Sequence, residues 1–406
     1  MSGVDVVPSP RTGLREPYGV SRRGAFVISF LARASAMGTI SIISPYLLDR
    51  GVPVSLLGLV MVGSALGSGA FALIAGRLVD RLGAWWVLVC GCLVSVAGVL
   101  ALVSAPTWQL MTASFFCSSA GMAAISNTLR TTIGLTTPEE DQEKVFGQLT
   151  SVATVGALIG PILVGLVVVQ STAAAPWFAI TMLTVATLTS LASRRPGVSA
   201  RLAQPESAEQ EPDPSAPSTF EVIKAILPIT ALVTTIATMY GVYATVWGVY
   251  LRELGAADPV IAWSFVATML PVVVLSPHAR RVLPRAPRWM VAGGSTLCLG
   301  LLAFVYAITT TVWLAIVVSV AEGVLMSVSL PITYSLIARQ APKGGLGRAF
   351  GATAAADSVS SGVGTAVAGT LIAAGGVAYS FRLAGAYCVA GTTLALVWWW
   401  RHRPAS

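Results

Sequence analysis

Charged residues are scarce in this sequence. Of its 406 residues, 10% are Asp, Glu, Lys or Arg, whereas soluble domains carry roughly a quarter. Apolar residues make up 55% of the chain, and its mean hydropathy is +0.78. These values exclude an ordinary soluble domain and indicate a protein that crosses a membrane several times.

Histidine and cysteine are also rare. The two histidines, His278 and His402, lie near the ends of apolar runs, so the sequence offers no histidine relay for protons. The five cysteines all lie within apolar runs, which predicts small buried side chains rather than disulfides or metal ligands. They are Cys90, Cys92, Cys117, Cys298 and Cys388.

Enzyme motifs are missing from the hydrophilic segments. No metal-ligand cluster, nucleophile–base pair or phosphate-binding loop occurs there, and no nucleotide-binding motif indicates ATP as a driving force. The sequence therefore predicts neither an enzyme nor a bound cofactor. The net charge of +8 does not indicate nucleic-acid binding, because the basic residues are scattered over the ends of apolar runs.

Twelve apolar runs have the length of membrane-spanning helices. They cover residues 24–48, 55–76, 85–105, 108–131, 147–169, 176–193, 222–251, 259–278, 289–309, 312–338, 348–374 and 380–400. The polar segment 1–21 predicts a disordered N-terminus, and the Pro- and Glu-rich segment 194–220 predicts a flexible linker. The expected fold is all-α, with six membrane helices in residues 22–193 and six in residues 221–403.

The basic residues predict the orientation in the membrane. Most of them fall into alternate loops, the pattern of a cytoplasmic side. The opposite loops hold only Arg50, Arg252 and Arg382. Both termini and the linker are therefore expected in the cytoplasm. The excess of arginine over lysine favours a bacterial source, and hence the bacterial plasma (inner) membrane as the location.

The polar stretch Gly76–Gly83 separates the second and third runs and reads Gly-Arg-Leu-Val-Asp-Arg-Leu-Gly. Its two glycines are expected to bracket a loop and to allow a sharp reversal of the chain. Gly76, Asp80, Arg81 and Gly83 resemble the signature loop between helices 2 and 3 of the major facilitator superfamily. The basic pair that ends this signature is replaced by Ala84-Trp85.

The resemblance covers nearly the whole chain, because that superfamily also has six plus six helices joined by a long central segment. It implies the major facilitator fold, in which two six-helix bundles enclose a central site. It also implies that the loop is a cytoplasmic gate. In the family the acid of this loop, here Asp80, engages the inner end of helix 11, which here carries Arg348.

The fifth run is rich in glycine. Glycines at positions i and i+4 share a helix face and let another helix approach closely, and proline bends a helix. The run carries Gly147, Gly156, Gly160, Pro161 and Gly165. It resembles the helix 5 motif of drug–proton antiporters, with Val164 in place of one expected glycine. This resemblance implies export in exchange for protons.

Three charged residues, Arg33, Glu322 and Asp357, lie deep within apolar runs. Insertion scales give a cost of roughly 2.5–3.5 kcal/mol for such a charge, so each should face a cavity or a partner. In the superfamily, helices 1, 4, 7 and 10 line the central cavity, which implies that Arg33 and Glu322 face each other. Glu322 is the expected proton-coupling acid and Asp357 the second candidate. The alternative is a static ion pair that holds the bundles together.

The seventh run places Tyr240, Tyr243, Trp247 and Tyr250 on one helix face. In the fourth run, Cys117 stands where the helix 4 motif of the antiporters would carry an arginine. The residues expected to contact substrate are Arg33, Met37, Cys117, Tyr240, Tyr243, Trp247 and Glu322.

Together these features predict a secondary active transporter that exports a small amphipathic compound, a drug or metabolite, by alternating access. The proton gradient is the expected driving force. The expected partners are this substrate, protons and the lipid bilayer, and the protein is expected to be a monomer. A proton-coupled importer of the same fold is the alternative. A non-transporting receptor or scaffold is a third reading, which the deep charges oppose.

Overall fold

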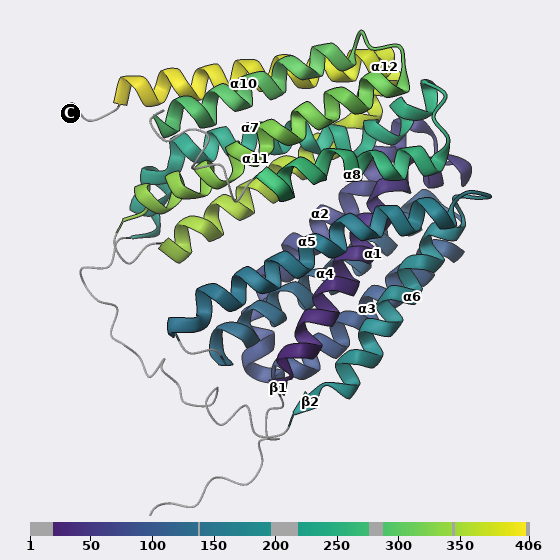
Figure 1. Ribbon diagram of the computed structural model, residues 1–406, viewed down its shortest axis with the longest axis vertical. Helices are drawn as coiled ribbons and strands as arrows, with labels where there is room; N and C mark the ends of the chain where they lie inside the picture. The colour runs from purple at the N-terminus through teal and green to yellow at the C-terminus, as the bar shows by residue number, and fades with distance from the viewer. Residues whose placement is uncertain (1–18, 137–138, 196–217, 276–286, 343–345, 403–406) are drawn as a thin grey trace, which may run out of the picture.

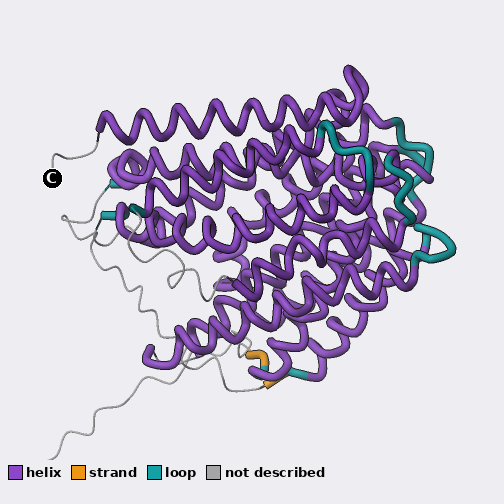
Figure 2. Tube along the Cα trace, turned by 45° about the horizontal axis from the view of Figure 1, so that its top comes forward, coloured by secondary structure: helices purple, strands orange, loops and turns teal. Residues whose placement is uncertain are grey.

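The computed structural model of the protein describes residues 19–136, 139–195, 218–275, 287–342 and 346–402. Nearly all of these residues are helical (Figure 2). The helices are α1 (Arg22–Asp49), α2 (Leu57–Leu82), α3 (Ala84–Ser104), α4 (Trp108–Thr136), α5 (Glu139–Val167), α6 (Ala174–Ala192), α7 (Thr219–Glu253), α8 (Asp258–Leu275), α10 (Arg288–Tyr306), α11 (Val312–Gln340) and α12 (Leu346–His402). A short 3-10 turn, η1 (Val54–Leu56), precedes α2.

The last helix consists of two membrane helices. With 57 residues, a straight α12 would be about 86 Å long, almost three times the thickness of a hydrocarbon core. Gly376 interrupts it with φ 78° and ψ −179°, a conformation that glycine adopts without strain. The two halves correspond to the eleventh and twelfth apolar runs, so the described residues form twelve membrane helices. The predicted all-α architecture of twelve membrane helices is confirmed.

The helices form two bundles (Figure 1). In the first bundle, α1 packs against α5 and α6, while α4 packs against α2 and α3. In the second, α12 packs against α7 and α10, while α11 packs against α8 and α10. We call the end of the molecule where α1 begins the Arg22 end, and the end where α1 finishes the Asp49 end.

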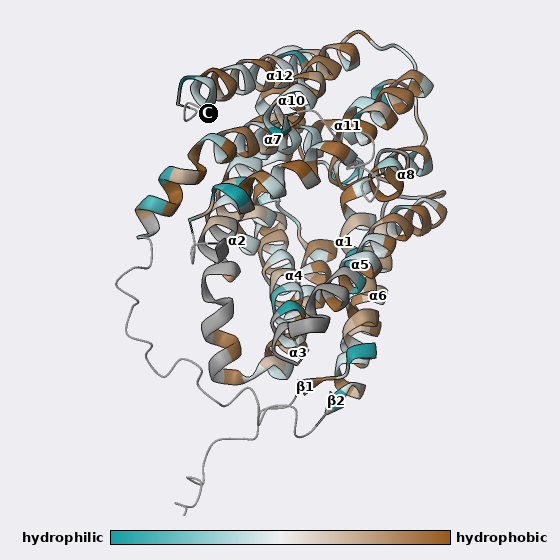
Figure 3. Cartoon of the chain, turned by 60° about the vertical axis from the view of Figure 1, so that its left-hand side comes forward, coloured by the Kyte–Doolittle hydropathy of each residue, from teal (hydrophilic) through white to brown (hydrophobic). Residues whose placement is uncertain are grey.

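Ten helices of the described part are long and apolar enough to cross a membrane, with α12 counted once. Helix α4 is not among them, because many of its side chains carry a hydroxyl group. They include Thr112, Ser114, Ser118, Ser119, Ser126, Thr128 and Thr132. Hydrophobic residues cover the helices along their length, and hydrophilic ones gather at several helix ends (Figure 3). The chain is a multi-pass membrane protein.

The predicted loop Gly76–Gly83 is wrong in its extent. Helix α2 continues through Gly76 to Leu82, and Gly83 alone makes the turn, with φ 83°. A helix can extend beyond the hydrocarbon because its polar residues are then hydrated. A single glycine in the left-handed region is enough to reverse the chain. The side chains of Asp80, Arg81 and Arg348 lie outside the described part of the structure, so the gate role stays a prediction.

A two-stranded ribbon joins the start of α1 to the end of α6. The strand β1 (Gly19–Val20) pairs antiparallel with β2 (Arg194–Arg195), and the Ser21 amide donates to the Ser193 carbonyl at 3.1 Å. The ordered chain therefore begins before residue 22, and the first two residues of the expected linker are part of a strand. The remaining residues of these two expected segments, 1–18 and 196–217, lie outside the described residues.

All five cysteines are free thiols, as expected, but the prediction that all are buried is wrong. Cys92 and Cys388 are buried, whereas Cys90, Cys117 and Cys298 are exposed. An apolar run does not distinguish the two environments, because the outer face of a membrane helix is as apolar as its packed face.

Glycines of α5 allow α1 to approach closely. A Cβ atom added at Gly156 or Gly160 would overlap the backbone carbonyl of Phe30 or Ala34, respectively. One at Gly165 would overlap the side chain of Trp263 in α8. Gly156, Gly160 and Gly165 therefore lie at helix–helix contacts. The surroundings of Gly147 lie outside the described part of the structure.

We expect Gly160→Leu to abolish transport of every substrate alike, because the new side chain would push α1 away from α5. Overpacking typically destabilises a protein by about 1–3 kcal/mol, and a backbone neighbour relaxes less than a side chain. The measurements are the thermal unfolding midpoint of the purified protein and the transport of a compound panel. Gly294→Leu is the matched control, since no atom lies within 4 Å of an added Cβ there. Selective loss of one compound would contradict the packing role of Gly160.

Candidate functional site

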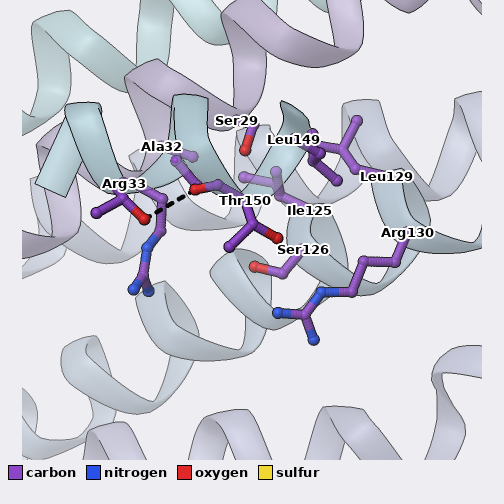
Figure 4. Close-up of a pocket in the computed structure, with 11 residues that line it drawn as sticks. Ser29, Ala32, Arg33, Ile125, Ser126, Leu129, Arg130, Leu149 and Thr150 are labelled. Atoms are coloured by element: carbon purple, nitrogen blue, oxygen red, sulfur yellow. Dashed lines mark hydrogen bonds between the residues drawn. The ribbon is translucent and has the colours of Figure 1, made fainter. Parts of the chain in front are cut away.

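A cavity of about 160 Å³ lies between α1, α4 and α5, in the half of the first bundle nearer the Arg22 end. Arg33 of α1 and Arg130 of α4 both line it, and both side chains are exposed. In Figure 4, Ser126 and Thr150 lie between the two arginines, whose guanidinium groups extend to the same side. The other lining residues are Ser29, Ala32, Ile125, Leu129, Leu149, Ala153 and Thr154.

A second cavity, of about 260 Å³, shares Arg33 and Ser126 with the first and extends toward the Asp49 end. Its walls come mainly from α1, α2, α3 and α4. Hydroxyl groups line it at Ser35, Thr39, Ser64, Ser68, Ser114, Ser118 and Ser119, and apolar side chains at Ile40, Val99, Leu102, Phe115, Met122 and Leu183. The two cavities follow α1 from Ser29 to Ile40, about 16 Å along its axis.

Glu322 is enclosed in the second bundle, in the middle of α11, with 3% of its surface exposed. The Tyr306 hydroxyl at the end of α10 donates to Oε2 of Glu322 at 2.8 Å. The other carboxyl oxygen, Oε1, has no hydrogen-bond partner among the described residues, and neither do the hydroxyls of Tyr240 and Tyr243. Both tyrosines are near enough to interact electrostatically with the carboxyl group.

Aromatic rings pack around this carboxyl group. Tyr243 meets Phe381 with ring centroids 5.0 Å apart and Tyr306 at 5.9 Å, both edge to face. Trp247 packs on Tyr306 at 5.3 Å and donates its indole N–H to Ser264 Oγ at 2.8 Å. Glu322 is thus surrounded by hydroxyl groups and rings, and no ion pair of the described residues involves it.

An ion-pair network at the Asp49 end joins the two bundles. Arg252 of α7 makes two hydrogen bonds to Asp49 of α1, at 2.8 and 3.1 Å, and two to Asp258 of α8, at 3.0 and 3.2 Å. Thr172, between α5 and α6, donates to Oδ2 of Asp49 at 2.5 Å. The network therefore connects α1 and the α5–α6 segment to α7 and α8.

Further contacts between the bundles lie near the same end. The Ser44 hydroxyl donates to the Thr245 carbonyl at 2.9 Å, and the Trp263 indole to the Ile162 carbonyl at 3.2 Å. At Gly58 of α2, an added Cβ would overlap the Thr365 carbonyl in the first half of α12. The bundles are thus packed tightly at the Asp49 end.

The structure brings only some of the predicted site residues together. Glu322 lies with Tyr240, Tyr243 and Trp247, whereas Arg33 lies with Arg130 in the other bundle. Arg33 and Glu322 are therefore not paired in this conformation.

The other predicted residues lie outside these groups. Met37 and Cys117 are not among the lining residues of the two cavities. Asp357 is exposed on the first half of α12.

Sequence analysis missed three features. Arg130 lies at the polar end of its run and therefore resembled a loop residue. Tyr306 ends the ninth run, where a tyrosine is usually part of the interfacial belt. The ion pair between Arg252 and Asp49 joins residues 203 positions apart, which the sequence alone does not bring together. A signal was available, because Asp49 and Arg252 each lie at the end of an apolar run on the side of the membrane that has few basic residues.

The sequence matches the family model of the Major Facilitator Superfamily over residues 25–251 and again over 226–406. The chain belongs to the Major Facilitator Superfamily. Members of this superfamily are membrane transporters, so the protein is a secondary transporter and not an enzyme. No curated protein matches the sequence.

Several solved structures share the fold. The nucleoside transporter NupG superposes with a TM-score of 0.79 at 12% identity, covering 94% of this chain and 99% of that one. A POT family transporter in complex with a thioalcohol-conjugated peptide gives 0.76 at 15% identity, covering 94% and 96%. The POT family transporter PepTSo gives 0.71 at 14% identity, covering 94% and 97%. At these identities the likeness establishes the fold of this superfamily member and not its substrate.

We expect Arg252→Gln to loosen the Asp49 end, because it removes the cation that holds Asp49 and Asp258. The side chains of Arg252 and Asp49 are 30% and 44% exposed, so the pair contributes about 0.2–1 kcal/mol. At the upper limit, the population open at this end would rise about fivefold. Spin labels at Val169→Cys and Ala257→Cys, in a variant without native cysteines, would report it as longer distances.

Glu253→Gln is the matched control for this measurement. It removes a neighbouring charge that takes part in no ion pair of the described residues. An unchanged distance distribution in Arg252→Gln, or an equal change in Glu253→Gln, would show that the network does not hold this end closed.

Proposed function

We propose that this superfamily member is a proton-coupled exporter of a small amphipathic compound and that Glu322 carries the proton. The observation that supports this proposal is the carboxyl group of Glu322, which is buried beside hydroxyl groups and has no cation partner. An ionised carboxylate in such a place lacks a charge to offset its desolvation. A residue of this kind is suited to gain and lose a proton when its surroundings change.

The surroundings of Glu322 can change because they come from several helices. Tyr306 belongs to α10, Tyr240 and Tyr243 to α7, and Phe381 to the second half of α12. Helix α7 also carries Arg252, which contacts the first bundle at the Asp49 end. A movement between the bundles therefore acts on the helix that places two hydroxyl groups beside the carboxyl group. Through α7, a change in the protonation of Glu322 can therefore be coupled to opening or closing of the Asp49 end.

The described conformation fits the state that loads substrate from the cytoplasm. The proposal places the Arg22 end in the cytoplasm, following the distribution of basic residues, and the protein in the bacterial plasma membrane as a monomer. The packed Asp49 end then faces outward. The two cavities beside α1 would be the substrate site, with room for a small compound.

Two motifs add support from resemblance. The glycines of α5 follow the pattern of drug–proton antiporters, and they let α1 and α5 approach beside the first cavity. Asp80, in the helix 2–3 signature, would hold the cytoplasmic side closed against the start of α12 near Arg348 in the alternate state. Multidrug export is the corresponding biological role.

Import is the second candidate. The solved structures of the same fold include peptide and nucleoside transporters. Cells with and without the protein distinguish the directions, since an exporter lowers the accumulation and toxicity of its substrates and an importer raises them. Raised accumulation of every responsive compound would exclude export.

We expect Glu322→Gln to bind substrate but to lose accumulation driven by an imposed pH gradient, falling to the level of protein-free vesicles. Glutamine resembles the protonated acid and can still accept the Tyr306 hydrogen bond, so the fold should persist. The measurement is transport into vesicles of a compound identified in the cell panel, with Asp357→Asn and the double variant alongside.

The outcomes separate three cases. Loss in Asp357→Asn with full coupling in Glu322→Gln would exchange the roles of the two acids. Full coupling in both single variants and in the double variant would contradict proton exchange through these residues. Retained downhill exchange in Glu322→Gln would support a role in coupling rather than in folding.

A further inference from the structure

We propose that Arg33 and Arg130 bind an anionic group of the substrate, so that the transported compound is an organic anion with a largely apolar body. The proposal takes the cavities beside α1 as the substrate site and to that extent rests on the proposed function. It does not depend on proton coupling or on the direction of transport.

Two positive charges line the first cavity. Arg33 interacts electrostatically with Arg130, a second cation that lines the same cavity. Both ion pairs found among the described residues involve Arg252 and neither involves these two arginines. Two like charges that share a cavity in a membrane protein repel each other, and an anion between them would relieve the repulsion.

The two arginines also supply hydrogen-bond donors to this cavity. A guanidinium group offers five N–H donors in a planar fork that matches the oxygens of a carboxylate or phosphate. The hydroxyls of Ser126 and Thr154, in the same cavity, already donate to backbone carbonyls of their own helices. Besides the hydroxyls of Ser29 and Thr150, which also line the cavity, the donors that remain are the N–H groups of two guanidinium groups, and their positive charge favours an oxyanion over a neutral or cationic group.

The space that adjoins the arginines is partly apolar. The second cavity begins at Arg33 and Ser126 and continues between apolar side chains such as Leu102 and Phe115. A ligand with its oxyanion at the arginines would place its apolar part there, beside scattered hydroxyl groups. A cationic amphiphile would be repelled by both arginines. The chemical class is thus an arylalkyl or alkyl carboxylate, phosphate or phosphonate.

The test is ligand binding by the full chain in nanodiscs of phosphatidylcholine, without any gradient. The probes are arylalkyl acids from benzoate to 4-phenylbutyrate, with phenylphosphonate, each beside its neutral amide or ester and the amine of the same skeleton. We expect the anions to raise the unfolding midpoint in proportion to their binding and the neutral and cationic analogues to have no effect. If no anion raises it, or if amides or amines act equally, the proposal is overturned.

Variants locate the site. Arg33→Gln and Arg130→Gln should each weaken anion binding about tenfold to a hundredfold, since each removes charge-assisted hydrogen bonds. Arg382→Gln, an exposed arginine in the second half of α12, is the matched control and should bind as wild type. Arg33→Lys and Arg130→Lys keep the charge and should retain part of the affinity. If a glutamine variant fails to fold, the lysine variant at the same position still tests the site. Equal affinity in all variants would overturn the proposal.

Two further arms separate the sources of the anion and the two proposals. If phosphatidylglycerol stabilises the protein through both arginines while no soluble acid does, the anion is a lipid headgroup and the substrate assignment is overturned. Anion binding with no pH-driven transport would refute the proton coupling alone, and pH-driven transport of compounds without an anionic group would refute this inference alone.

Discussion

The hydrocarbon of a membrane offers no hydrogen-bond partners, so every polar group of a spanning segment must find its partner within the protein. Many serine and threonine side chains meet this constraint on their own helix. The hydroxyls of Thr39 and Thr112, for example, donate to carbonyls four residues earlier, at 2.8 and 2.9 Å. These groups need no neighbouring helix and leave the helices free to pack by shape.

Packing by shape explains the placement of glycine. Helices in lipid gain little from the hydrophobic effect and associate through close contacts between small residues. Gly156 and Gly160 serve this purpose within one bundle, and Gly58 and Gly369 between the bundles. The charged residues form the exception, since they mark the places that the helices alone cannot satisfy. These are the arginine-lined cavity, the carboxyl group of Glu322 and the network around Arg252.

Hydrophobic runs predicted the helices well, because length and apolar content are what the bilayer selects. The first run, 24–48, became α1 at 22–49, and the fold class followed from the pattern. Partners were harder to predict. A buried Glu322 was foreseeable, because an acid deep in an apolar run must lie inside the protein. Its contact with Tyr306 was not, since it depends on where α10 ends relative to α11. The exposed cysteines were missed because a lipid-facing surface has the same composition as a packed one.

Among the described residues, the hydrogen bonds and ion pairs that join the two bundles lie near the Asp49 end, so a rotation about this end displaces the opposite end most. Helix α1 has 28 residues and is about 42 Å long. If the bundles rock about the Asp49 end while it stays closed, a tilt of roughly 10° moves the far end of such a helix by about 7 Å, while atoms near Asp49 move very little. Opening at the Asp49 end itself requires the contacts of Arg252 to break. A small rotation that leaves the hydrogen bonds near Asp49 intact would therefore open a passage wide enough for a small molecule at the opposite end.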